Sequence, residues 1–286
     1  MLKQPEWLKV KAASPEKIEY VEKILQQEKL ETVCENANCP NISECFSKHT
    51  ATFMILGSIC TRNCGFCAVN SGKPGPVDIE EPVHLASAVK RLGLEYVVIT
   101  SVTRDDLLDG GAEHFAECIK TVRQYNANAL IEVLIPDFRG SIDALNIVAD
   151  ASPNVINHNI ETVPRLYPAA RKYANYKRSL KIIRDAKSLN PSVFTKSGLM
   201  LGLGETREEI LLTMRQISDA GCDILTLGQY LSPSKQHLPI ERYVEPGEFD
   251  QLKQEGLKMG FSAISAGPLV RSSYKAKDFF AKTPGT

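Results

Sequence analysis

The sequence has no excess of charge of either sign, because 34 lysine and arginine residues balance 34 aspartate and glutamate residues. A balanced chain offers no field that would attract nucleic acid or an anionic membrane surface. The sequence also has no apolar run long enough to cross a bilayer, no internal repeat and no low-complexity tract. Its first nine residues are too polar for a secretion signal. We therefore expect a cytoplasmic protein that binds neither nucleic acid nor membranes.

Histidine is scarce, with five residues in 286, and none of them lies inside a group of cysteines. Cysteine, in contrast, is concentrated, because six of the eight cysteines lie between positions 34 and 67. They form two groups of three, spaced Cys34-x4-Cys39-x5-Cys45 and Cys60-x3-Cys64-x2-Cys67. Any account of function has to explain this clustering.

Two structural explanations of the clustered cysteines are weak. Disulfides would close only short loops here, and the absence of a secretion signal indicates a reducing compartment. Structural zinc usually takes four ligands from paired C-x2-C units, whereas these cysteines come in threes without a histidine. His49 lies between the two groups, but nothing in its spacing makes it a ligand.

The downstream group fits an iron–sulfur cluster better. Its short spacers let the backbone curl so that Cys60, Cys64 and Cys67 point their sulfur atoms at one face of a 4Fe–4S cube. Three thiolates bind three of the irons, and the fourth iron stays open. An open iron is a site for chemistry, whereas a cluster with four protein ligands mainly carries electrons.

Hydrophobic periodicity predicts strands that alternate with helices along most of the chain. The six predicted strands cover residues 52–57, 95–101, 129–135, 155–160, 194–201 and 223–229. The helices that follow them cover residues 82–92, 112–125, 141–151, 175–189, 206–220 and 246–259. Such alternation indicates parallel strands with right-handed crossovers. We expect an α/β fold, a partial (β/α)6 TIM-type barrel with its chemistry at the carboxyl ends of the strands.

Three segments follow from this pattern. Residues 1–50 form an N-terminal extension, residues 51–260 the barrel and residues 261–286 a C-terminal extension. Within the first, an extended arm at residues 1–13 precedes a helix that ends near residue 30. The upstream cysteines come next, in a stretch where Asn36, Asn38 and Pro40 predict a loop without regular structure.

Polar residues gather where the predicted strands end. Thr100 closes the second strand, and Asn157, His158, Asn159 and Glu161 lie in and just after the fourth. Buried polar groups need partners, which either a bound polar ligand or an internal hydrogen-bond network would supply. The sequence leaves both explanations open.

Arginines and glycines near the later strands are equally open to two interpretations. Arg165, Arg171 and Arg178 would either hold a carboxylate or be solvated helix charges. Gly202 and Gly204 mark either a close approach of backbone to ligand or a tight turn.

The motifs resemble a known superfamily. With Phe66 before Cys67, the downstream cysteine segment after the first strand resembles the signature of radical S-adenosylmethionine (SAM) enzymes. The upstream cysteines, together with Arg271-Ser-Ser-Tyr274, more narrowly resemble the lipoyl synthase family, from about residue 30 to residue 280. Further agreement comes from Thr103-Arg-Asp-Asp-Leu107, Asp109-Gly-Gly-Ala112, His158-Asn-Ile-Glu-Thr-Val-Pro-Arg-Leu-Tyr167, Lys196-Ser-Gly-Leu-Met-Leu-Gly-Leu-Gly-Glu-Thr206 and His237-Leu-Pro239.

The resemblance implies a radical mechanism at the downstream cysteines. Cys60, Cys64 and Cys67 would hold a 4Fe–4S cluster whose open iron binds the amino and carboxylate groups of SAM. One electron would release a 5′-deoxyadenosyl radical, which takes hydrogen from C6 and C8 of an octanoyl chain. Two SAM molecules would serve the two insertions of sulfur, and the product would be the lipoyl cofactor on a protein lysine.

The resemblance also implies an auxiliary 4Fe–4S cluster on Cys34, Cys39 and Cys45, carried by the two extensions of the barrel. Its sulfides would become the inserted sulfur atoms. Its fourth ligand would be a serine of the Arg-Ser-Ser-Tyr motif, for which we choose Ser273, with Ser272 as the alternative.

Cofactor contacts and partners follow from the same resemblance. Thr100, Asn159, Glu161 and Arg171 are expected to contact SAM through hydrogen bonds and charge. The expected partners are an octanoylated lipoyl carrier protein, an electron donor such as ferredoxin or flavodoxin, and a carrier that repairs the consumed cluster.

Two other functions compete with sulfur insertion by a lipoyl synthase. One is another sulfur-inserting radical SAM enzyme, such as a biotin-synthase-like one, although the upstream cysteines and the Arg-Ser-Ser-Tyr motif argue against it. The other is a two-cluster electron-transfer protein, whose clusters would both need four cysteines. Only Cys118 and Cys222 remain for that purpose, and both are expected to be buried structural thiols.

Overall fold

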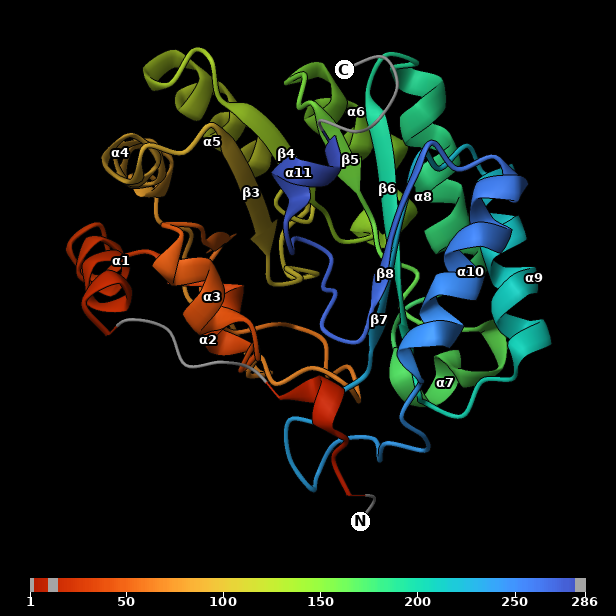
Figure 1. The fold of residues 1–286 in the computed structure, drawn as a ribbon. Helices are drawn as coiled ribbons and strands as arrows, with labels where there is room; N and C mark the ends of the chain where they lie inside the picture. The colour runs from red at the N-terminus through yellow and green to blue at the C-terminus, as the bar shows by residue number, and fades with distance from the viewer. Residues whose placement is uncertain (1–2, 10–14, 281–286) are drawn as a thin grey trace. The chain divides into compact units, whose positions relative to one another are not determined.

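The computed structural model describes residues 3–9 and 15–280 (Figure 1). Residues 1, 2 and 10–13 of the expected arm, and residues 281–286 of the expected C-terminal extension, lie outside the described residues. The chain divides into two compact units. One comprises Val10–Arg62 and Ala68–Ile156, and the other Met1–Lys9, Asn63–Cys67 and Asn157–Thr286. The division into two extensions and a barrel stays a prediction.

The strands form an eight-stranded, mostly parallel sheet in the order β1 to β8, which is open within the described residues. The short β1 is antiparallel to β2, whereas the pairs β2–β3, β3–β4, β6–β7 and β7–β8 are parallel. The strands are β1 (Glu31–Thr32), β2 (Thr52–Ile55), β3 (Tyr96–Ser101), β4 (Leu130–Leu134), β5 (Val155–Asn157), β6 (Phe194–Leu201), β7 (Ile224–Gln229) and β8 (Ala263–Gly267).

All six predicted strands are therefore present, although β5 is shorter than expected, and the α/β class is confirmed. The sequence did not predict β1 or β8. Strand β8 consists of Ala-Ile-Ser-Ala-Gly, which is not an apolar run, and its conformation depends on pairing with β7.

The long helices also lie where periodicity predicts them. They are α1 (Pro15–Gln27), α4 (Glu81–Leu92), α5 (Ala112–Tyr125), α6 (Ile142–Asp150), α8 (Tyr176–Leu189), α9 (Arg207–Asp219) and α10 (Pro246–Met259). Helix α9 shows why the local sequence suffices, because Thr206 and Glu209 form a complete capping box at its start. None of the described helices has the length and apolar character needed to cross a membrane.

The expectation of an irregular loop at the upstream cysteines is wrong. Two short helices form there, α2 (Val33–Asn36) and α3 (Ile42–Ser47). Helix α2 begins because Thr32 accepts a hydrogen bond from the backbone of Glu35. Asn38, which has a positive φ of 49°, and Pro40 fall between the two helices and end the first one.

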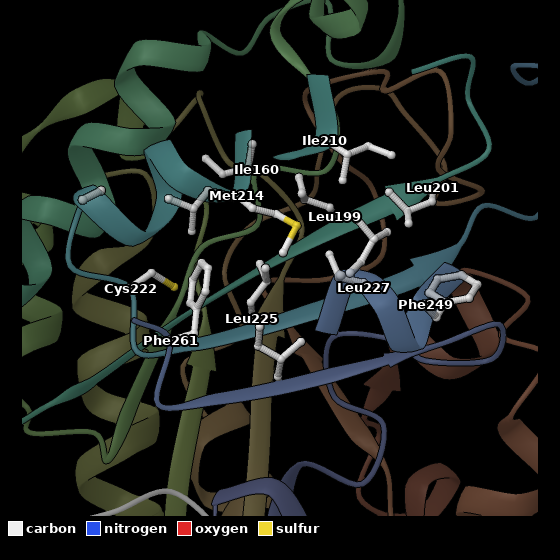
Figure 2. Packing of buried hydrophobic residues seen from close by; sticks show 14 of the residues in the cluster. Ile160, Leu199, Leu201, Ile210, Met214, Cys222, Leu225, Leu227, Phe249 and Phe261 are labelled. Carbon is white, nitrogen blue, oxygen red and sulfur yellow. The ribbon is translucent and has the colours of Figure 1, made fainter. Parts of the chain in front are cut away.

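Each unit has its own core. In the first, Phe53 and Val97 of the sheet are buried together with Leu85 and Phe115 of the covering helices. In the second, β6, β7 and β8 have α8, α9 and α10 along one side (Figure 1). Figure 2 shows Met214 of α9 and Phe249 of α10 within the same apolar cluster as Leu225 of β7. These cores fix the strand ends from which the polar loops extend.

The segment after β8 lies close to β7. A Cβ atom on Gly228 would lie 2.0 Å from the carbonyl oxygen of Val270, so only glycine permits this approach. The same segment then brings Ser272 to β5, where Asn157 donates a hydrogen bond of 2.7 Å to the serine hydroxyl. Gly228 thereby determines where the Arg-Ser-Ser-Tyr motif lies within its unit.

We predict that Gly228→Ala displaces this segment and lowers the free energy of unfolding by about 1–3 kcal/mol, because the new methyl group has no room. Urea denaturation measures the change. Gly247→Ala is the matched control, since a methyl group added at this position of α10 would meet nothing within 4 Å, and there alanine should be neutral or stabilising. Equal stabilities for the two variants would contradict the close packing of Val270 on Gly228.

Candidate functional site

The segment that carries Cys60 leaves β2 through two left-handed residues, Leu56 (φ 68°) and Gly57 (φ 87°). Leu56 is held on both sides of its backbone. Its N–H donates to the carboxylate of Glu81 at 2.9 Å, and its carbonyl accepts from the guanidinium of Arg104 at 3.1 Å. A non-glycine residue in this conformation is strained, so the surrounding contacts impose the direction in which the segment leaves the strand.

The sulfur of Cys60 accepts two backbone hydrogen bonds. The N–H groups of Arg62 and Thr103 lie 3.4 and 3.3 Å from its Sγ atom. Hydrogen bonds to ligand sulfurs tune iron–sulfur clusters. The environment of Cys60 therefore fits a metal-bound thiolate.

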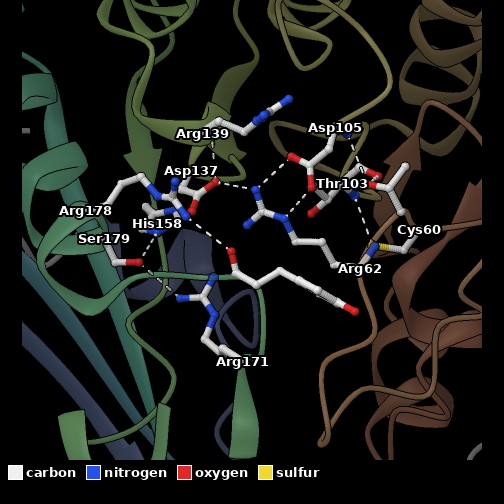
Figure 3. Close-up of polar contacts among 12 residues, drawn as sticks. Cys60, Arg62, Thr103, Asp105, Asp137, Arg139, His158, Arg171, Arg178 and Ser179 are labelled. Atoms are coloured by element: carbon white, nitrogen blue, oxygen red, sulfur yellow. Dashed lines mark hydrogen bonds and ion pairs between the residues drawn. The ribbon is translucent and has the colours of Figure 1, made fainter. Parts of the chain in front are cut away.

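The side chain of Arg62 fastens this segment to the ends of two strands (Figure 3). Its guanidinium makes two bonds to Asp105 after β3, at 2.7 and 2.8 Å, and one of 2.7 Å to Asp137 after β4. Arg62 is 7% exposed, and the Asp137 side chain is fully buried. Burial disfavours the charge on Arg62, but hydrogen bonds to both carboxylates outweigh it and raise the arginine pKa.

Arg62 and Asp137 were missed as site residues by the sequence analysis. Asp105 lies in a motif that supported the family resemblance, but no local pattern connects it to Arg62, which lies 43 residues earlier. The available signal was an arginine between Cys60 and Cys64, in a segment that directly follows a predicted strand.

Cys64 and Cys67 belong to the other unit and are held by different contacts. Between them, Gly65 donates to the carbonyl of Ala170 at 2.9 Å and accepts from the N–H of Leu238 at 2.8 Å. The ring of His237 bonds the carbonyl of Cys67 at 3.0 Å. The His237-Leu-Pro motif therefore positions the backbone of the cysteine segment.

The polar residues after β5 form a connected group in the same unit. The guanidinium of Arg171 donates to the carbonyl of Asn159 at 2.8 Å and to the hydroxyl of Tyr167 at 3.1 Å. It also reaches the hydroxyl of Ser179 at 3.3 Å, which in turn bonds the ring of His158 (Figure 3). The structure thus brings Asn159 and Arg171 together, and the bonds of Arg171 form an internal hydrogen-bond network.

Glu161 also belongs to this group, and both its backbone conformation and the pKa of its carboxyl are unusual. Its backbone φ is 70°, and burial raises the pKa of its carboxyl, which Arg171 and Asn159 offset only in part. Burial opposes the charge on Arg171, but Tyr167, Glu161 and Cys64 together raise its pKa. Among the described residues, Nε of Arg171 is buried without a hydrogen-bond partner. An unsatisfied buried donor here leaves one bond for a ligand to make.

Thr100 lies in the other unit, and its hydroxyl donates to the carbonyl of Leu134 at 3.0 Å.

Of the two interpretations of Gly202 and Gly204, the structure supports a tight turn, because Glu205 closes it. Both oxygens of Glu205 accept bonds from the backbone N–H groups of Gly202 and Leu203, at 2.6 and 2.9 Å. Arg165 likewise forms an exposed ion pair with Glu209.

The upstream cysteines lie near one another around α2 and α3. Burial first, and then the neighbouring Cys39, raises the pKa of the Cys34 thiol to about 11. Burial, Cys34 and Cys39 together raise the pKa of Cys45 to about 12. The raised pKa values favour the neutral thiol at Cys34 and Cys45, and a bound cation would displace their protons.

The described residues contain no group of three or more histidine, cysteine or acidic side chains arranged around a single metal ion. All eight cysteines are free thiols, so the disulfide explanation is wrong. Soft thiolate donors in groups of three are typical of iron–sulfur clusters.

Ser272 and Ser273 follow β8. The hydroxyl of Ser272 accepts from Asn157 at 2.7 Å and donates to Asn159 at 3.1 Å. Both hydrogen-bonding roles of this hydroxyl are therefore taken within the unit. Cys118 and Cys222 are buried, with 0% and 4% exposure, as expected of structural thiols, and burial raises the pKa of both.

Comparisons with known proteins identify relatives of this chain. A family model described as "Radical SAM superfamily" matches residues 54–217. Lipoyl synthase from Caldicellulosiruptor bescii is 53% identical over 277 residues, covering 97% of this chain and 95% of that protein. Lipoyl synthase from Alkaliphilus metalliredigens is 51% identical over 98% of this chain and 97% of its own length. Lipoyl synthase from Bordetella pertussis is 56% identical over 96% of this chain and 83% of its own length.

Solved structures are similar in fold alone. The [FeFe]-hydrogenase maturase HydG superposes with a TM-score of 0.57 at 14% identity, covering 91% of this chain and 74% of that one. Methylornithine synthase gives a TM-score of 0.52 at 15% identity, covering 91% and 84%.

We predict that Arg62→Gln lowers the free energy of unfolding of the metal-free chain by about 3–5 kcal/mol, because Asp137 loses its buried cation. Urea denaturation measures the loss. Arg91→Gln is the matched control, since it removes an ion pair to Glu28 in which the arginine is 38% exposed, and its loss should stay below about 1 kcal/mol. If the two variants lose the same stability, Arg62 does not fasten the segment.

Proposed function

This chain belongs to the lipoyl synthase family of the radical SAM superfamily, and from that premise we propose which residues perform each part of the reaction. Identity above 50% over nearly the whole chain is the observation that carries the function. With 4Fe–4S clusters and SAM bound, a lipoyl synthase inserts sulfur into an octanoyl group held on a carrier protein. The chain is thus a radical SAM sulfurtransferase. A biotin-synthase-like enzyme and an electron-transfer protein have no support among these relatives.

We propose Cys60, Cys64 and Cys67 as the ligands of the SAM-binding cluster. The two backbone donors on the Cys60 sulfur support a thiolate at that position. The bonds of Gly65 and His237 fix the backbone between and after the other two cysteines. These contacts preorganise the ligands, which reduces the ordering that binding requires.

We propose Cys34, Cys39, Cys45 and Ser273 as the ligands of the auxiliary cluster. Cys39 raises the pKa of Cys34, and Cys34 and Cys39 raise that of Cys45, which supports the grouping of the three residues. Ser273 is the proposed fourth ligand, with Ser272 as the alternative; the hydroxyl of Ser272 accepts from Asn157 and donates to Asn159. A serine oxygen is a harder donor than a thiolate and binds iron less well, which favours opening of a cluster that is to be consumed.

Asn159, Glu161 and Arg171, with Thr100, are the proposed SAM contacts. The unsatisfied Nε of Arg171 supports a role in holding a carboxylate, and the half-buried Glu161 supports a role in accepting hydrogen bonds from a hydroxyl or an ammonium group. These side chains bind and orient the cofactor and exclude water from it.

The finer architecture and the partners are part of the same proposal. Residues 51–260 form a partial (β/α)6 barrel, and the extensions at residues 1–50 and 261–286 carry the auxiliary ligands. Ferredoxin or flavodoxin supplies electrons, and a separate carrier repairs the consumed cluster. The thiolate ligands suit the reducing conditions of the cytoplasm.

Iron analysis separates the two proposed clusters. The anaerobically prepared chain should hold about eight iron and eight sulfide per molecule, and Cys34→Ala about four of each. Cys34→Ala should still cleave SAM but insert no sulfur, because only the auxiliary cluster loses a ligand. Cys118→Ala is the control and should keep about eight iron, because that thiol is buried away from both groups. Loss of SAM cleavage in Cys34→Ala would contradict the assigned roles.

A further inference from the structure

The stretch from the end of α7 (Tyr167–Ala170) through α8 is strongly basic in a chain that is otherwise balanced. Between residues 171 and 187 the only acidic residue is Asp185. Against it stand seven basic residues, Arg171, Lys172, Lys177, Arg178, Lys181, Arg184 and Lys187. A local excess of this size, with none overall, produces a positive potential on one part of the surface.

The basic residues of α8 share one face. Ser179, Ile182, Ile183 and Ala186 are the buried residues of the helix. Positions 177, 181 and 184 repeat at helical spacing on the opposite side, and all three are exposed. They extend over about 10 Å of helix.

Two exposed residues extend this face toward the site. Lys172 is exposed, and Tyr173 has 65% of its surface open. They directly follow Arg171, whose side chain belongs to the polar group around Asn159. We call Lys172, Tyr173, Lys177, Lys181 and Arg184 the α8 basic surface.

The charges of this surface are largely uncompensated. Lys181 pairs with Asp185 one turn away. Within the described part of the chain, Lys172, Lys177 and Arg184 form no ion pair. Three uncompensated cations close together are available to an outside partner.

Helix stability does not explain these positions. The first turn of α8 contains Lys177 and Arg178 and no acidic residue. The amino end of a helix already carries positive partial charge, so cations there are unfavourable and acids favourable. Helix α9 follows the favourable pattern, with Glu208 and Glu209 in its first turn. The basic start of α8 therefore indicates a function that outweighs its cost to the helix.

We propose that the α8 basic surface docks an acidic face of the octanoylated carrier protein, a proposal that rests on the proposed function. The octanoyl chain is neutral, so it offers no charge by which the correct protein could be attracted or oriented. Opposite charges on the two protein surfaces provide both. Tyr173 adds an exposed aromatic anchor, a residue type enriched among those that dominate interfaces. Lys172, the first residue of this surface, directly follows Arg171, so a carrier bound here contacts the neighbour of a proposed SAM contact.

Charge reversal tests the docking. The variant Lys172→Glu/Lys177→Glu/Arg184→Glu changes the surface, and Lys23→Glu/Lys90→Glu/Lys120→Glu makes the same change in net charge at exposed lysines of α1, α4 and α5. Each is assayed anaerobically with the whole octanoylated carrier and with a short octanoyl-lysine peptide of no net charge. The peptide reports on the catalytic site without the carrier surface.

The expected result is specific to one variant and one substrate. At low salt, the α8 variant should raise KM for the carrier by about tenfold or more, with peptide turnover unchanged, and high salt should shrink the difference. An unchanged KM for the carrier would overturn the proposal, as would an equal rise in the control variant. Charge-dependent binding of RNA or of phosphatidylserine vesicles to this surface, with carrier KM unaffected, would also overturn it.

Failure of the proposed function and misfolding of the variant can each be distinguished from failure of the docking proposal. If the wild-type chain lipoylates neither substrate, the proposed function fails, and the docking proposal falls with it before any variant is compared. If the reversed variant loses peptide turnover through misfolding, Lys177→Gln/Arg184→Gln removes the charges without adding acids. Its carrier KM should rise at least about threefold with peptide turnover intact, and no rise would reject the docking.

Discussion

The position of the segment that carries Cys60 depends on one buried cation, the guanidinium of Arg62. Arg62 lies between Asp105 and Asp137, at the ends of two neighbouring parallel strands, while its own backbone N–H donates to the sulfur of Cys60. A buried arginine between carboxylates tolerates little movement, because any shift leaves charge without a partner. The position of the Cys60 sulfur, a proposed metal ligand, is thereby tied to the ends of β3 and β4. Catalytic chemistry with radicals needs such rigidity, since a misplaced radical reacts with whatever lies nearest.

In the second unit, hydrogen bonds to the backbone, rather than a buried ion pair, hold Cys64 and Cys67 in place. Gly65 lies against Ala170 and Leu238, and His237 bonds the carbonyl of Cys67, so backbone contacts position this half of the cysteine segment. Nearby, the group around Arg171 is an internal hydrogen-bond network that still has one buried donor to offer. Of the two explanations that the sequence left open for the polar strand ends, the internal hydrogen-bond network is observed, and the bound ligand stays a proposal.

The sequence predicts what is encoded locally. Strands such as β3 and helices such as α9 have periodicity and caps within their own residues, and they lie where expected. Cysteine spacing likewise predicts two groups of ligands, and that assignment stays a prediction. Features that depend on distant partners are missed. Arg62 and Asp137 are 75 residues apart, β8 needs β7 to become a strand, and α2 needs Thr32 as its cap among residues that usually break helices. Basic residues on α8 are visible in the sequence, but their common exposed face is not.

The central claim is that this chain inserts sulfur from its own auxiliary cluster into a carrier-bound octanoyl group. The most direct measurement is the mass of an octanoylated carrier after anaerobic incubation with SAM, a strong reductant and enzyme whose clusters were assembled with heavy-isotope sulfide. The account predicts a product that has gained two heavy sulfur atoms as a dithiol, and that loses two hydrogen atoms when the dithiol is oxidised to the disulfide. An unchanged carrier, or a product whose sulfur is of natural isotopic composition, would contradict it.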